Sequence, residues 1–234
     1  MFAQRPHHLR PHRTAAMNTA SFERYWIPRI MVLLHAVGVT GILAGFGQYF
    51  LDFTAVNLLV NGVLALWADW EERHWTWAAA FGGGIVVEII GVQTGYLFGD
   101  YSYEMALGPM VAGVPLILGV LWWISLLGCG WWTDRLLNRL QWRAKTLGGK
   151  LRRALIAATL MMAFDGLIEP VAIQAGWWAW KGVHVPWFNY ASWWGVSFIF
   201  YLLPRRRREN IGTGFLVAIF VFFFVFLNWF PWTR

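Results

Sequence analysis

The sequence is poor in charged residues. Of its 234 residues 13% are charged, whereas soluble domains carry about 25%. Hydrophobic residues make up 58%, above the roughly 45–50% of ordinary globular chains. So few charges cannot cover the surface of a water-soluble fold of this size. The composition therefore excludes a soluble domain and indicates an integral membrane protein.

Other scarce residues exclude particular chemistries. The only cysteine, Cys129, rules out an internal disulfide framework. No lysine lies in the last apolar segment, which excludes a retinal Schiff base there. Of the six histidines only His35 lies in an apolar run, so the clustered histidines of membrane di-iron oxygenases are missing. His35 is interpreted as a packing residue, with a haem or chlorophyll ligand as the alternative.

No cofactor or metal site is expected. The sequence contains no G-x-G-x-x-G, so it lacks the flavin or nicotinamide fingerprint. The pair Asp165 and Glu169 has a spacing similar to the metal–diphosphate sites of membrane prenyltransferases. Those sites need several acids and basic residues near the membrane surface, and this alternative is disfavoured.

Apolar runs long enough to cross a bilayer need about 20 residues, and seven candidates occur. The predicted fold is an all-α, polytopic membrane helix bundle with seven transmembrane helices, and residues 25–234 form its single membrane domain. Residues 1–24 lack an apolar core and are predicted to be a mobile cytoplasmic tail. The predicted spans are residues 27–49, 53–70, 75–97, 109–132, 154–178, 188–204 and 211–231.

Basic residues predict the orientation through the positive-inside rule. With the N-terminus in the cytoplasm, 17 of the 19 Lys and Arg residues fall in inner segments, and only Lys181 and Arg234 fall outside. An even number of spans would spoil this partition. The basic stretch 134–153 is interpreted as a loop that rests on anionic lipid headgroups, so no nucleic-acid partner is expected.

Three acids lie inside the predicted spans: Glu88, Asp165 and Glu169. A charged side chain at the bilayer centre costs roughly 2.5–3.5 kcal/mol, and such residues face the bundle interior. Asp165 and Glu169 are four residues apart and share a helical face. Glu88 is predicted at a depth between them, so all three acids could line one cavity.

No Lys or Arg is predicted at that depth, so no cation is expected to neutralise the three acids. Two or three ionised carboxylates close together repel, and at least one should hold its proton at neutral pH. A protonated carboxyl group in a dry site is suited to general acid catalysis. The alternative is a purely structural role, in which the acids hydrogen-bond neighbouring helices.

Several segments resemble a known family. They are Glu88-Ile-Ile-Gly-Val-Gln-Thr-Gly-Tyr-Leu-Phe-Gly-Asp-Tyr-Ser-Tyr with Gly113-Val-Pro115, Asp165-Gly-Leu-Ile-Glu-Pro170 with Gly176-Trp-Trp-Ala-Trp180, and Val185-Pro-Trp-Phe-Asn189 with Trp193-Trp194. Together they are similar to the membrane carotenoid hydratases, such as γ-carotene 1′-hydroxylases and bisanhydrobacterioruberin hydratase. Glu169 and Ser192 depart from the Asp and Gly expected in that family.

The resemblance implies a cofactor-independent lyase, a carotenoid 1,2-hydratase. Such an enzyme adds water across the terminal C1=C2 double bond of an acyclic carotenoid end group. Protonation of the alkene creates a carbocation, which a carboxylate and aromatic faces can stabilise. Asp165 or Glu169 is the predicted proton donor, and Glu88 the counter-charge or the base for water.

The residues expected to contact substrate or its water come from the same segments. Tyr101, Tyr103 and Asn189 are expected to order water, with an interface-anchor role as the alternative for the two tyrosines. The other predicted substrate contacts are Tyr96, Phe98, Asp100, Trp178, Trp193 and Trp194.

The expected location is the cell membrane, with lipid and an acyclic carotenoid as partners. The alternative function is a carotenoid- or pigment-binding structural subunit of a membrane complex, which would add partner membrane proteins. A proton-coupled transporter is a third reading.

Overall fold

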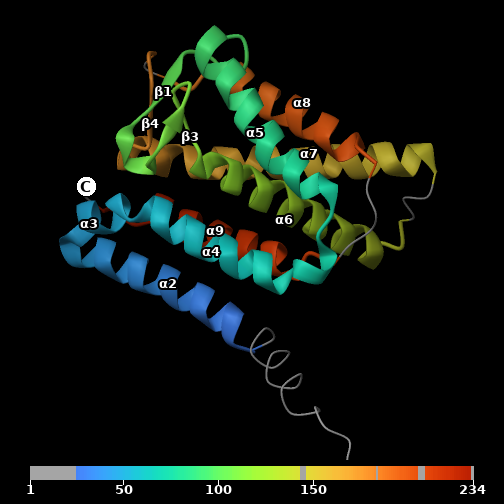
Figure 1. Ribbon diagram of the computed structural model, residues 1–234, viewed down its shortest axis with the longest axis horizontal. Coiled ribbons are helices and arrows are strands. Elements are labelled where there is room, and N and C mark those ends of the chain that lie inside the picture. The colour runs from blue at the N-terminus through green and yellow to red at the C-terminus, as the bar shows by residue number, and fades with distance from the viewer. Residues whose placement is uncertain (1–24, 143–145, 183, 205–208, 233–234) are drawn as a thin grey trace, which may run out of the picture.

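The computed structural model describes residues 25–142, 146–182, 184–204 and 209–232, and the predicted tail 1–24 lies outside them. Figure 1 shows a bundle of long helices with two small two-stranded sheets at one end. The elements are α2 (Ile27–Gly41), η2 (Ile42–Phe46), α3 (Gly47–Asp52), α4 (Thr54–Ala68), η3 (Trp70–Glu72), α5 (Trp75–Thr94), β1 (Tyr101–Tyr103), η4 (Met105–Leu107), β2 (Met110–Val111), β3 (Val114–Pro115), α6 (Ile117–Arg139), α7 (Leu147–Ala175), β4 (Trp178–Trp180), α8 (Trp187–Leu202) and α9 (Ile211–Trp229).

Seven of the described helices have 15 or more residues, one in each predicted span. Four segments are long and apolar enough to cross a membrane: Ile27–Phe46, Trp75–Thr94, Leu147–Ala175 and Ile211–Trp229. Among the others, α4 has 15 residues and α8 has 16. Helix α6 has 23 residues, but its last turns carry Asp134, Arg135 and Arg139. Membrane crossing by these three helices stays a prediction.

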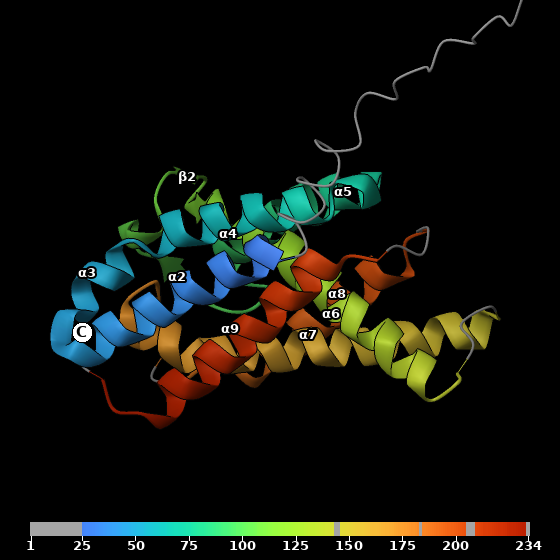
Figure 2. The ribbon, with the colours of Figure 1, turned by 90° about the horizontal axis from the view of Figure 1, so that it is seen from below.

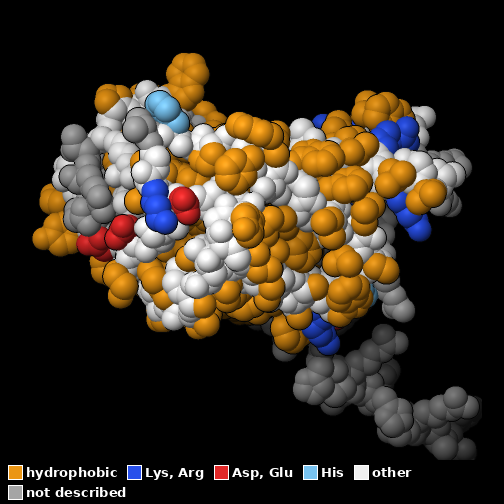
Figure 3. Space-filling view, turned by 90° about the horizontal axis from the view of Figure 1, so that it is seen from above, with side chains coloured by type: hydrophobic (Ala, Val, Ile, Leu, Met, Phe, Trp, Pro, Cys, Tyr) orange, Lys and Arg blue, Asp and Glu red, His pale blue; other side chains and the backbone are white. Residues whose placement is uncertain are grey.

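Successive long helices run back and forth along the bundle, as Figures 1 and 2 show. The α4–α5 and α6–α7 connections therefore lie at the same end, and the α5–α6 and α7–α8 connections lie at the opposite end. Among the described basic residues, the first end carries Arg73, Arg135, Arg139, Lys150, Arg152 and Arg153, and the second carries Lys181. Hydrophobic side chains cover the middle of the face shown in Figure 3, and the few Lys and Arg side chains lie around it.

Two predicted span boundaries differ from the structure. The fourth predicted span begins at residue 109, but α6 begins at Ile117 and the apolar residues before it form the β2–β3 hairpin. The turn of that hairpin uses Gly113 at φ +81°, which a helix cannot contain. The fifth predicted span begins at residue 154, whereas α7 begins at Leu147.

The early start of α7 corrects the interpretation of Arg153 as a loop residue at the headgroups. Arg153 lies within α7 and is buried. Its Nε donates to Asp134 Oδ1 at 2.7 Å, and its guanidinium also contacts Asp134 Oδ2 and the Gly130 carbonyl, both at 3.3 Å. The basic residue therefore ties α6 to α7.

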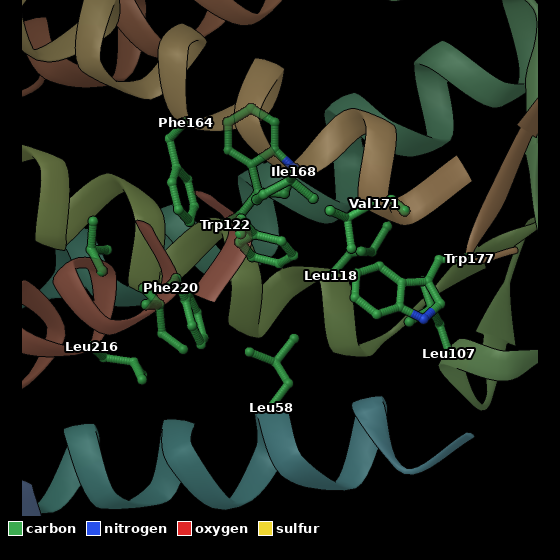
Figure 4. Packing of buried hydrophobic residues seen from close by; sticks show 14 of the residues in the cluster. Leu58, Leu107, Leu118, Trp122, Phe164, Ile168, Val171, Trp177, Leu216 and Phe220 are labelled. Carbon is green, nitrogen blue, oxygen red and sulfur yellow. The ribbon is translucent and has the colours of Figure 1, made fainter. Parts of the chain in front are cut away.

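Two helices form the centre of the bundle: α6 contacts α4, α5, α7 and α9, and α9 contacts α2, α4, α6 and α7. Figure 4 shows Leu118 and Trp122 of α6 among Ile168 of α7 and Phe220 of α9, with Leu58 of α4 across from them. Apolar packing of these side chains fixes the helices around α6.

A buried acid joins α4 to α9. Asp69 follows the last residue of α4 and is 1% exposed. Its carboxylate accepts hydrogen bonds from the backbone N–H groups of Gly212 and Thr213 at 2.6 and 2.9 Å, and from Thr213 Oγ1 at 3.1 Å. These N–H groups begin α9 and have no partner within the helix, so Asp69 caps α9 from a distant part of the sequence.

The all-α prediction missed two short antiparallel strand pairs, β1–β4 and β2–β3. In the first pair Tyr101 lies opposite Trp180, Ser102 opposite Ala179, and Tyr103 opposite Trp178. Alternate residues of a strand point to the same side. The pairing therefore places Tyr101, Tyr103, Trp178 and Trp180 on one side of the ribbon.

Candidate active site

A small pocket lies where the β1–β4 ribbon meets α5, α6, α7 and α8. It encloses about 40 Å³, enough for about one to three water molecules. Glu88, Asp165 and Glu169 all line it, so the structure brings the three predicted acids together. The other lining residues are Phe98, Tyr101, Tyr103, Leu118, Leu121, Trp122, Phe164, Ile168, Trp178, Trp180, Asn189 and Trp193. This set is called the acid pocket below.

Glu88 of α5 accepts hydrogen bonds from three side chains. Its Oε2 accepts from the hydroxyls of Tyr101 at 2.6 Å and Tyr103 at 2.7 Å, and its Oε1 accepts from Trp122 Nε1 at 2.9 Å. Glu88 is 2% exposed. Three donors and no acceptor in this set suit a carboxylate, which only accepts hydrogen bonds.

Glycines on the same face of α5 make this arrangement possible. A Cβ at Gly84 would lie 2.4 Å from the Trp122 side chain, and a Cβ at Gly91 would lie 2.8 Å from the Tyr101 hydroxyl oxygen. Gly84, Glu88 and Gly91 follow a spacing of four and three residues and so share a helix face. The two glycines leave room for the groups that donate to Glu88 on either side of it.

A strained turn folds β1 back onto α5. Helix α5 ends at Gly95 with φ +67°, and Phe98 and Gly99 follow at +70° and +119°. Positive φ is uncommon for a residue with a side chain and persists where the surrounding structure enforces it. Phe98 is 1% exposed, and its ring packs against those of Tyr101 and Trp193. Packing of Phe98 in the acid pocket therefore holds the turn.

The two tyrosines remain donors over the whole physiological range. Burial raises the pKa of the Tyr101 phenol, and the charge of Glu88 raises it further. Burial and Glu88 raise the pKa of Tyr103 in the same way. Both phenols therefore keep their protons and point them at Glu88.

Asp165 and Glu169 of α7 have fewer donors than Glu88. Asn189 Nδ2 donates to Asp165 Oδ2 at 3.2 Å. The indole N–H groups of Trp178 and Trp180 both donate to Glu169 Oε1. Among the described residues Asp165 Oδ1 and Glu169 Oε2 receive no hydrogen bond, so each acid has one oxygen free to carry a proton.

Aromatic rings form most of the remaining wall. Trp122 and Trp193 stack with their ring centroids 4.3 Å apart and their planes 7° apart. Tyr101 packs against Trp180, and Tyr103 against Trp178. Within the part of the chain that the structure describes, no Lys or Arg lines the acid pocket. A positive charge that forms there would meet carboxylates and ring faces.

Three residues predicted to contact substrate lie outside the acid pocket. Tyr96 is 87% exposed. Asp100 pairs at the surface with Lys181, 3.4 Å away. Trp194 donates to Thr159 Oγ1 at 3.2 Å and stacks on Phe198. Asp100 and Trp194 directly neighbour residues of the pocket, but alternate strand residues and successive helix residues face different directions.

Trp122 and Trp180 line the acid pocket but were not among the predicted site residues. A buried indole N–H usually finds an acceptor, and that of Trp122 donates to Glu88. The buried indole N–H of the adjacent Trp123 has no partner among the described residues. A Trp in the middle of an apolar span therefore could not by itself have assigned Trp122 to Glu88. Among the described residues no group of three or more His, Cys, Asp or Glu is placed to hold a metal ion.

Comparisons with known proteins identify the family of this chain. The carotenoid biosynthesis protein family matches residues 46–231. Bisanhydrobacterioruberin hydratase from Haloarcula japonica is 34% identical over 195 residues, which cover 75% of this chain and 64% of that relative. No solved structure matches the chain. These matches confirm the resemblance stated from the sequence segments: the chain belongs to the carotenoid biosynthesis protein family.

Proposed function

We propose that this membrane protein is a carotenoid hydratase that adds water across the terminal C1=C2 double bond of an acyclic carotenoid end. The observation that carries the proposal is the meeting of three buried carboxyl groups in one aromatic pocket, which has room for water and has no Lys or Arg among the described residues of its lining. The name of the Haloarcula japonica relative supports the same reaction class. The proposed enzyme is a lyase that works without a cofactor.

The proton donor is Asp165 or Glu169, because each of them has a carboxyl oxygen that can carry a proton. The donated proton adds to C2, where the electrons of the C1=C2 π bond form the new C–H bond and leave a tertiary cation at C1. A water oxygen then bonds to C1, and the proton it loses passes to a carboxylate of the pocket. The sum is alkene plus water giving a tertiary alcohol, with the acid restored.

Glu88 is suited to remain charged throughout, because Tyr101, Tyr103 and Trp122 all donate to it. It therefore serves as the counter-charge for the cation, and the faces of Trp122 and Trp193 add cation–π stabilisation of about 2 kcal/mol or more in a dry site. Asn189 donates its amide N–H to Asp165, which leaves its amide oxygen to hold the attacking water.

Expression in cells that make an acyclic carotenoid tests this function. Pigment extracts from cells with the gene should contain the tertiary alcohol, and extracts from matched cells without it should not. Unchanged carotenoid that co-purifies with the protein would instead support the pigment-binding subunit. Unchanged carotenoid that does not bind would contradict both functions.

We further propose that all seven long helices cross the cell membrane with the N-terminus in the cytoplasm. The grouping of described basic residues at one end of the bundle supports this orientation. Reporter fusions should place the N-terminus in the cytoplasm and the C-terminus on the opposite side. Reporters active on the same side would mean an even number of spans and would overturn the topology.

A further inference from the structure

A second cavity, larger than the acid pocket, lies beside it. It encloses about 290 Å³ between α2 and α4 on one side and α6, α7 and α9 on the other. This volume is close to the lower end of the roughly 300–1,000 Å³ typical of small-molecule sites. Figure 4 shows part of its walls, with Leu58 of α4 facing Leu118 of α6 and Phe220 of α9. This cavity is called the apolar chamber below.

The apolar chamber and the acid pocket share a wall. Leu118, Leu121, Ile168 and Trp178 line both cavities. Ile168 lies between Asp165 and Glu169 on α7, and Trp178 donates to Glu169. Only single side chains therefore separate the chamber from the acids.

The chamber reaches the outer surface of the bundle at the seam between α2 and α4. Four of its lining residues there are exposed: Val37 by 50%, Phe53 by 62%, Val56 by 55% and Val60 by 40%. All four are apolar, so this opening faces the lipid in the proposed topology. A hydrocarbon could enter without passing through water.

The lining suits an uncharged, unsaturated chain. None of the described Asp, Glu, Lys or Arg residues lines the chamber, and the rings of Phe220, Phe223 and Phe224 form one wall. His35 also lines it, and its Nδ1 lies 2.8 Å from the Met31 carbonyl oxygen. A carbonyl only accepts, so Nδ1 of His35 carries a proton.

We propose that the apolar chamber binds the polyene arm of the substrate, next to the end group that reacts in the acid pocket. This inference rests on the proposed function and adds the site that holds the substrate. The carotenoid enters that site from the lipid, between α2 and α4. Its terminal double bond then passes the side chains of the shared wall to reach the acids.

Gly38 offers a way to fill the chamber without touching the acid pocket. It lies on the face of α2 that carries His35 and Ile42, and it lines the chamber. A Cβ there would meet Phe223 at 4.0 Å, an ordinary contact, so a larger side chain would extend into the free space. Ala36 is exposed on the same helix and does not line the chamber. Ala36→Phe is therefore the matched control for Gly38→Phe.

The test measures kinetics in membranes and the carotenoid retained by purified protein from carotenoid-making cells. Gly38→Phe should raise KM for the carotenoid at least about tenfold, the low end of what misfit in an apolar pocket costs. Its kcat should stay close to that of the wild type, and it should retain less carotenoid than Ala36→Phe. Gly38→Leu serves the same purpose if Gly38→Phe is not recovered folded.

Equal KM and equal retention in the Gly38 and Ala36 variants would overturn the inference, as would a lower kcat with unchanged KM. If the wild type hydrates no carotenoid, the proposed function fails. The amount of carotenoid that the purified protein retains then tests by itself whether the chamber binds a polyene. Lower retention in the Gly38 variant would still support a polyene site. A bound lipid acyl chain in place of carotenoid would refute it.

Discussion

Asp165→Asn and Glu169→Gln are expected to lower the rate of carotenoid hydration by about 10²–10⁴-fold, the usual contribution of a positioned proton transfer. Each amide keeps an oxygen that can accept the hydrogen bonds seen in the structure, from Asn189 in one case and from Trp178 and Trp180 in the other. What each variant loses is the transferable proton. The amount of folded protein in the membrane should therefore stay close to that of the wild type.

Glu88→Gln should behave differently, because the amide nitrogen would face a donor where the carboxylate now offers an acceptor. At least one of Tyr101, Tyr103 and Trp122 would lose its partner, and a buried unsatisfied donor costs about 1–3 kcal/mol. This variant should lose both activity and stability.

Asp100→Asn is the matched control for the acid variants, because Asp100 is a surface acid outside the pocket. Its activity should equal that of the wild type. Near-normal turnover by well-folded Asp165→Asn and Glu169→Gln would contradict acid catalysis. The acids would then be structural, and pigment binding without catalysis would become the better account.

Arg153→Met is expected to destabilise the folded protein by about 3–5 kcal/mol, the cost of removing one partner of a buried ion pair. The side chains of Arg153 and Asp134 are only 7% and 16% exposed. Loss of the guanidinium would remove the charge that Arg153 supplies to the Asp134 carboxylate between α6 and α7. Chemical unfolding of the detergent-solubilised protein measures the effect.

Arg152→Met is the control, with the same substitution one residue earlier. The guanidinium of the half-buried Arg152 lies 4.5 Å from the Trp142 ring centroid, a contact worth about 0.5–2 kcal/mol. Adding Asp134→Asn to Arg153→Met should recover part of the lost stability. Equal losses in Arg152→Met and Arg153→Met would show that the ion pair does not hold the two helices together.

The positions of the long helices and the inward orientation of the three acids could be predicted from the sequence, because both depend on local pattern. Apolar runs locate each long helix, and a carboxyl group in such a run must face the interior. The spacing of Asp165 and Glu169 places them on one face of α7, and the structure brings Glu88 to the same pocket.

The surroundings of the acids depend on contacts between distant segments. Strands β1 and β4 have three residues each, too few for an alternating pattern to be recognised. Their pairing nevertheless decides that Tyr101, Tyr103, Trp178 and Trp180 face the pocket. The cap that Asp69 provides to α9 likewise joins segments more than 140 residues apart, and no local signal predicts it.

Isotope labelling of the product tests the central claim, acid-catalysed addition of water, most directly. Membranes that contain the wild-type protein would be supplied with an acyclic carotenoid in deuterium oxide enriched in oxygen-18, under ordinary dioxygen. The account predicts one deuterium bonded to C2 and oxygen-18 in the hydroxyl at C1. A hydroxyl that takes its oxygen from dioxygen, or a product without deuterium at C2, would contradict it.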